Sequence, residues 1–140
     1  VGMKDGRYYI LDMRRMRGTP AQVEALIRQT AELDGRAVPI HIEQEGGASG
    51  KIALDTYQRR VLAGWAVRAE TATKSKTERA APVSSAAEAG NVMLKRGAWI
   101  TTMLDEFEAF PQGSHDDQVD AVSGAFAQLT HSGWSRSPSA

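Results

Sequence analysis

The stretch AVPIHIEQEGGASGK, residues 37–51, decides the fold. Its first part, Ala37 to Ile42, is a short and mainly apolar run of the kind that forms a buried parallel strand. A polar, glycine-rich loop follows through Gly50, and a helix is expected near residues 51–63. A strand, a loop and a helix in this order predict one unit of an α/β fold.

The segments on both sides of this unit continue the alternation. A β-hairpin is predicted around the turn Asp5-Gly6, and a helix from Pro20 to Asp34 behind the capping residue Thr19. Further elements are predicted as a strand near 65–69, a helix within 75–89, a strand at 92–94, and helices at 98–109 and 115–130. We therefore expect an α/β domain over residues 1–130, a mixed sheet flanked by helices, followed by a disordered tail over residues 131–140.

The first strand of the hairpin is very short. Only Val1-Gly2-Met3 precedes the turn region, whereas the second strand, from Tyr8, is rich in aromatic and branched residues. We therefore expect the sheet to be truncated at its first strand, as in a domain cut from a longer protein.

Composition and charge exclude several classes of protein. The 140 residues include no cysteine, so a disulfide framework, a thiolate metal site and a cysteine nucleophile are all excluded. No apolar run approaches the roughly 20 residues that a membrane-spanning helix needs. The net charge is zero, but residues 101–140 hold six acidic residues and one basic residue. A basic body with an acidic end segment is typical of a protein that binds a polyanion and a divalent metal. An equally good interpretation of the charges alone is that both sets are ordinary solvated surface residues.

The glycine-rich loop is not a nucleotide-binding P-loop. That motif has a glycine five residues before its Gly-Lys pair, where this chain has Glu45, and a Ser or Thr after the lysine, where it has Ile52. The carboxylates of Glu43 and Glu45 would also repel a triphosphate. We therefore do not expect ATP binding.

Three aspartates, Asp116, Asp117 and Asp120, crowd the first turns of the last predicted helix. On a helical wheel they fall within about 100° of one another, away from the apolar stripe. Ser114 is a possible cap, and acids near a helix N-terminus each gain roughly 0.3 to 1 kcal/mol from the helix dipole, so a capped, solvated helix end is one interpretation. The other is a divalent metal site, because three like charges in one sector repel unless a cation lies among them.

Glu43 is the candidate partner of these aspartates. It stands where the predicted strand of residues 37–42 runs out into the loop, which is where open α/β sheets carry functional groups. Glu45 points the same way from an extended segment, but Glu43 lies nearer the rigid strand. The alternative is that both are ordinary loop charges.

The order and spacing of several short motifs resemble the C-terminal nuclease domain of phage large terminase subunits. The resemblance runs from residue 1 to about residue 130. Its motifs are Ile10-Leu11-Asp12 with Arg14 and Arg17, Ile42 to Glu45 with Gly50-Lys51, Lys74 to Pro82, Ala89 to Val92, Trp99, Phe107 to Pro111, and His115 to Ala121.

This resemblance implies a ribonuclease-H-like fold and an endonuclease that cuts concatemeric DNA with two Mg²⁺ or Mn²⁺ ions. It makes Glu43, Asp117 and Asp120 metal ligands and adds Asp116 as a further catalytic acid, with Asp117 favoured among the three aspartates. The family's first catalytic aspartate lies upstream of the segment that Val1-Gly2-Met3 resembles, and Asp12 on a neighbouring strand is a poor substitute. His115 beside the helix start is more often structural than catalytic.

The resemblance also implies partners. These are double-stranded DNA, the terminase ATPase domain, the small terminase subunit and the portal protein, with no membrane, in the cytoplasm of the bacterial host. Salt-sensitive contacts to DNA phosphates are expected from Lys51, Arg68, Lys74, Lys76 and Arg79. Two alternatives remain open: a catalytically silent remnant that binds DNA or packaging partners, and a junction resolvase of the same general fold.

Overall fold

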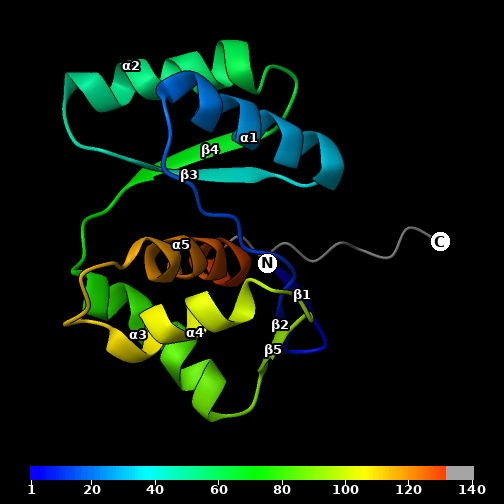
Figure 1. The fold of residues 1–140 in the computed structure, drawn as a ribbon, viewed down its shortest axis with the longest axis vertical. Coiled ribbons are helices and arrows are strands. Elements are labelled where there is room, and N and C mark those ends of the chain that lie inside the picture. The colour runs from blue at the N-terminus through cyan, green and yellow to red at the C-terminus, as the bar shows by residue number, and fades with distance from the viewer. Residues whose placement is uncertain (132–140) are drawn as a thin grey trace. The chain divides into compact units, whose positions relative to one another are not determined.

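The structure of the protein is a computed structural model that describes residues 1–131 (Figure 1). The domain expected over residues 1–130 consists of two compact units. Unit 1 contains Val1–Arg14 and the chain from Lys74 onward, and unit 2 contains Arg15–Thr73. The mixed α/β class is confirmed, with the strands in two separate sheets, one in each unit.

Unit 1 is built on a three-stranded mixed sheet with the order β1-β2-β5. Strands β1 (Gly2–Lys4) and β2 (Arg7–Ile10) form the predicted antiparallel hairpin. Asp5 and Gly6 make the turn with φ values of 53° and 73°, the left-handed conformation that an Asp-Gly pair adopts at low cost. Strand β5 (Val92–Leu94) pairs parallel to β2.

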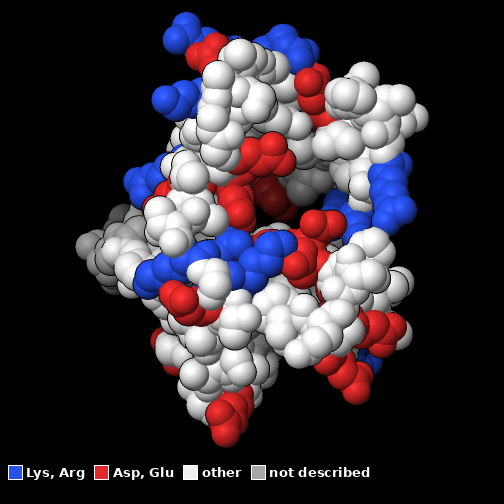
Figure 2. All heavy atoms as spheres, turned by 90° about the vertical axis from the view of Figure 1, so that its left-hand side faces the viewer, with Lys and Arg blue, Asp and Glu red and all other residues white. Residues whose placement is uncertain are grey.

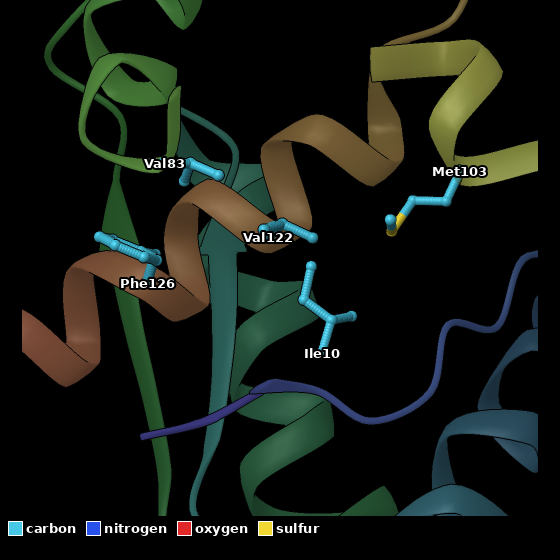
Figure 3. Packing of buried hydrophobic residues seen from close by; sticks show 5 residues of the cluster. All are labelled: Ile10, Val83, Met103, Val122 and Phe126. Carbon is cyan, nitrogen blue, oxygen red and sulfur yellow. The ribbon is translucent and has the colours of Figure 1, made fainter. Parts of the chain in front are cut away.

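Three helices pack with this sheet: α3 (Lys76–Glu88), α4 (Ile100–Ala109) and α5 (Asp117–His131). Their core is a cluster of five buried side chains, shown in Figure 3: Ile10, Val83, Met103, Val122 and Phe126. The ring of Phe126 lies on that of Tyr8, with 3.9 Å between the centroids. The apolar stripe of α5 is therefore buried as its 3.6-residue period predicts, and the aspartates at its start lie off that stripe.

Unit 2 is a two-stranded parallel sheet with two helices on one side of it (Figure 1). Its elements are α1 (Pro20–Asp34), β3 (Ile40–Gln44), α2 (Ala48–Thr56) with a π-helical turn η1 (Tyr57–Val61), and β4 (Val67–Thr71). Ala31, Val61 and the fully buried Leu62 form the core against Ile40 and Ile42 of β3. The alternation along β3 thus puts its isoleucines on the covered face and His41 and Glu43 on the other.

The start of α1 is as predicted. The Thr19 hydroxyl accepts a hydrogen bond from the Gln22 backbone N–H, and the Gln22 side chain accepts one from the Thr19 backbone N–H. This reciprocal capping box, followed by Pro20 at the first helical position, satisfies two amides that the helix itself leaves unpaired.

Several predicted boundaries were wrong by a few residues. The helix expected at 51–63 begins earlier, at Ala48, because Gly47, three residues after the end of β3, turns the chain with a φ of 90°. The helix expected at 115–130 begins at Asp117 and continues through His131, which sequence reasoning had assigned to the tail. Residues 132–140, the rest of that tail, lie outside the described residues.

None of the helices within residues 1–131 is long and apolar enough to cross a membrane.

Candidate active site

The acidic group of unit 1 lies at the first turn of α5. Asp117 is the first helical residue, and the backbone carbonyl of Asp116 accepts from the Asp120 N–H at 2.9 Å. Asp116 therefore occupies the capping position by its backbone. Its side chain does not cap the helix but turns to α3.

Two cations from α3 hold two of the three aspartates. The Lys76 ammonium lies 2.7 Å from Asp116 Oδ2 and 3.0 Å from Asp120 Oδ2, and Arg79 Nη2 lies 3.1 Å from Asp120 Oδ1. The side chains of Arg79 and Asp120 are 18% and 17% exposed, so this pair is half-buried. Both carboxylate oxygens of Asp120 are thus occupied by cationic partners.

The pKa of Lys76 reflects this arrangement. Hydrogen bonds to Asp116 and then to Asp120 raise the pKa of the ammonium well above its ordinary value. Lys76 is therefore charged at neutral pH and well above it.

Asp117 differs from its two neighbours. Its side chain is exposed, and it makes no hydrogen bond or ion pair with any other residue in the range 1–131. A carboxylate at a helix start is commonly explained as a cap, but the first-turn amides after Asp117 already have another partner. Glu106 of α4 accepts hydrogen bonds from the backbone N–H groups of Gln118, at 2.6 Å, and Val119, at 3.3 Å.

The expectation that Ser114 caps this helix is therefore wrong. The helix begins at Asp117, three residues after Ser114, and the capping acceptor comes from a different helix. Sequence reasoning missed Glu106, although a signal was present. An acid that follows Met103 by three residues and directly precedes Phe107 lies on the apolar stripe of α4, where a charge needs a buried partner.

Glu43 of unit 2 lies inside β3, not beyond its end, because the strand runs through Gln44. Its side chain is on the uncovered face of the β3–β4 sheet and pairs in register with Glu70 of β4, a second acid that sequence reasoning missed. His41, on the same face, has its Nε2 4.0 Å from Glu70 Oε2. Glu45 follows the strand and is exposed.

The remaining candidates are more ordinary in their surroundings. Asp12 accepts from the Met13 N–H at 2.9 Å and forms an ion pair with Arg14 at 3.0 Å, so its charge is engaged locally. His115 is exposed and precedes α5.

The predicted phosphate contacts fall into two groups. Lys51 on α2, Arg68 on β4 and Lys74 before α3 are exposed, whereas Lys76 and Arg79 hold the aspartates of α5. Figure 2 shows a band of basic side chains on this face of the molecule that borders a group of acidic ones.

Within residues 1–131 no three His, Asp or Glu side chains gather closely enough to hold a metal ion. The aspartates of α5 come closest in sequence, but Lys76 and Arg79 supply the positive charge beside two of them. Of the three aspartates at the start of α5, Asp117 is the one without a cationic partner among residues 1–131.

The family model described as Terminase RNaseH-like domain matches residues 1–129. The matched range includes β3 with Glu43 and the aspartates at the start of α5. No curated protein and no solved structure matches the chain.

Proposed function

Because the chain belongs to the terminase RNase H-like domain family, we propose that it is the metal-dependent endonuclease domain of a viral DNA-packaging terminase. Its substrate would be concatemeric double-stranded DNA, cut by hydrolysis of phosphodiester bonds. The observation that carries this proposal is Asp117 at the first turn of α5. Its carboxylate is exposed, it does not cap the helix, and it forms no ion pair within residues 1–131. The family favours this reading over a junction resolvase of the same general fold.

Glu43 and Asp117 are the proposed metal ligands. Their carboxylate oxygens are the hard donors that Mg²⁺ and Mn²⁺ prefer, and both side chains are exposed. Two such ions, when bound, would activate a water molecule and stabilise the leaving oxygen of the phosphodiester. Asp120 fits a direct ligand less well, because Lys76 and Arg79 already contact both of its oxygens.

We assign Asp116 and Asp120 the task of holding the start of α5. Their ion pairs with Lys76 and Arg79 hold α5 against α3. Asp117, which lies between them in the sequence, is therefore on a helix whose start is fixed. This arrangement also lowers the repulsion that three adjacent carboxylates would otherwise exert on one another. Asp117 keeps its charge available for a ligand.

The proposed DNA contacts are exposed basic side chains on both units. Lys51, Arg68 and Lys74 would bind phosphates without reading the base sequence, which gives affinity that falls steeply with salt. Lys76 and Arg79 would join them only by exchanging a carboxylate partner for a phosphate.

The proposed partners follow from the family. A terminase nuclease domain acts with the terminase ATPase domain, the small terminase subunit and the portal protein, in the cytoplasm of the bacterial host.

A specific observation favours a second candidate function. Two of the three aspartates at the start of α5, Asp116 and Asp120, are paired with Lys76 and Arg79. This pairing favours a domain that binds DNA or packaging partners without cutting.

Titration with Mn²⁺ by calorimetry, combined with plasmid cleavage on the same samples, tests the proposal. The variants are Asp117→Asn and Glu43→Gln, with Asp105→Asn and Glu108→Gln as controls that remove exposed charges of the same kind elsewhere. We expect both test variants to lose Mn²⁺ binding and cleavage while both controls keep them. A folded wild-type chain that binds no Mn²⁺ would refute the nuclease and leave the non-cutting binding domain.

A further inference from the structure

Glu106 is a buried carboxylate that serves another helix. It lies on α4 with 7% of its surface exposed, and it accepts three hydrogen bonds from one short segment of α5. The donors are the backbone N–H of Gln118 at 2.6 Å, the side-chain Nε2 of Gln118 at 2.6 Å, and the backbone N–H of Val119 at 3.3 Å.

These bonds replace the cap that α5 lacks in its own sequence. A helix leaves its first amides without internal partners, and a negative charge near them is favoured by the helix dipole. A buried carboxylate is in turn costly unless several donors surround it. Glu106 and the first turn of α5 therefore satisfy each other, which ties the helix start to one position on α4.

Asp117 directly precedes the two residues that Glu106 holds. Each residue advances an α-helix by about 100°, so a slip of this turn by one residue would carry the Asp117 carboxylate to a different face. The lateral ion pairs of Asp116 and Asp120 fix α5 against α3, but they contact the side chains, not the backbone of the first turn. The backbone that directly follows residue 117 is therefore fixed in part by Glu106.

We propose that Glu106 is a positioning residue for the metal ligand Asp117: it fixes the first turn of α5 and so sets the direction in which that carboxylate points. This inference rests on the proposed function, in which Asp117 binds Mg²⁺ or Mn²⁺. Glu106 itself is buried against α5 and does not contact the ion.

The test variant is Glu106→Gln, which keeps the size of the side chain. A glutamine keeps one oxygen that can accept from the backbone N–H groups, but it removes the negative charge and turns an amide donor toward the side-chain Nε2 of Gln118, which must flip to pair with it. The control is Glu108→Gln on the same helix, where the same charge is removed from an exposed position. The double variant Glu106→Gln with Gln118→Glu exchanges the two side chains, so that the amide of residue 106 can donate to the carboxylate of residue 118. It tests whether the Mn²⁺ affinity is recovered when this hydrogen bond is restored.

Two measurements are made on the full chain. Amide hydrogen exchange follows the first turn of α5 against its later turns without metal, and calorimetry gives the affinity for Mn²⁺. For Glu106→Gln we expect faster exchange confined to Gln118 and Val119 and a Kd for Mn²⁺ raised roughly 10- to 100-fold, the usual effect of removing a group that orients a metal ligand. The double variant should recover most of this loss, and Glu108→Gln should show none.

The outcomes separate the inference from the function on which it rests. A Kd unchanged in Glu106→Gln, with faster exchange in the first turn of α5, would make Glu106 a cap only and overturn the positioning role while leaving the nuclease intact. A wild-type chain that binds no Mn²⁺ would overturn both. If Glu106→Gln alone fails to fold, a folded double variant that binds Mn²⁺ like the wild type supports the role, and one that binds far more weakly contradicts it.

Discussion

Asp117 and Asp120 lie three residues apart on one helix, yet their replacement by asparagine should affect the stability of unit 1 very differently. Asp120→Asn removes the charge that faces Lys76 at 3.0 Å and Arg79 at 3.1 Å. The exposed Lys76 pair contributes about 0 to 1 kcal/mol, and the half-buried, charged hydrogen bond to Arg79 about 1.5 to 3 kcal/mol. The total cost is therefore about 1.5 to 4 kcal/mol.

Asp117→Asn removes a charge that has no partner within residues 1–131. The variant loses only the interaction of the carboxylate with the helix dipole, about 0.3 to 1 kcal/mol. The two isosteric substitutions therefore differ by about 0.5 to 4 kcal/mol in the free energy of unfolding, although they remove the same charge from the same helix.

Hydrogen exchange of the slowest amides in α5 measures this difference for unit 1 without interference from unit 2. A loss of 2 kcal/mol in Asp120→Asn corresponds to exchange that is about 30-fold faster, whereas Asp117→Asn should change the rate by about fivefold or less. Equal effects of the two variants, or a larger effect of Asp117→Asn, would refute the assignment of Asp120 to structure and of Asp117 to ligand binding.

Three further predictions concern the framework around the site. Phe126→Ala should destabilise unit 1 by about 3 to 5 kcal/mol in urea unfolding, because the ring is 4% exposed and fills the core; a loss below about 1 kcal/mol would contradict this packing. Gly50→Ala should destabilise unit 2 by about 1 to 3 kcal/mol, because a Cβ there would overlap the carbonyl oxygen of Glu45. The control is Gly46→Ala, where an added Cβ would have no atom within 4 Å, and its stability in the same urea experiment should stay near that of the wild type. Burial, and then the charge of a neighbouring glutamate, raise the pKa of the Tyr57 hydroxyl in the folded chain. The contribution of Tyr57 to the free energy of unfolding is therefore fully present below the pKa of the unfolded chain and is lost as pH rises through the folded pKa. Tyr57→Phe should remove this loss of stability at alkaline pH, and an unchanged dependence of stability on pH would contradict the prediction.

Several features of the fold followed from local sequence alone. The Asp5-Gly6 turn, the capping box at Thr19 and the apolar stripe of α5 each depend on residues within a few positions of one another, so periodicity and capping rules suffice to predict them. The acids at the start of α5 were found in the same way, since their spacing alone puts them off the apolar stripe.

The use of each acid was decided by tertiary structure. Lys76 and Asp116 are 40 residues apart and Glu106 and Gln118 are 12 apart, so neither the ion pair nor the cap can be read from local spacing. Only the packing of α3 and α4 around α5 determines that two aspartates are neutralised, that the first turn is capped from another helix, and that Asp117 is left exposed. Sequence fixes which charges a helix carries, but a charge acts on whatever the fold brings within a few ångströms of it.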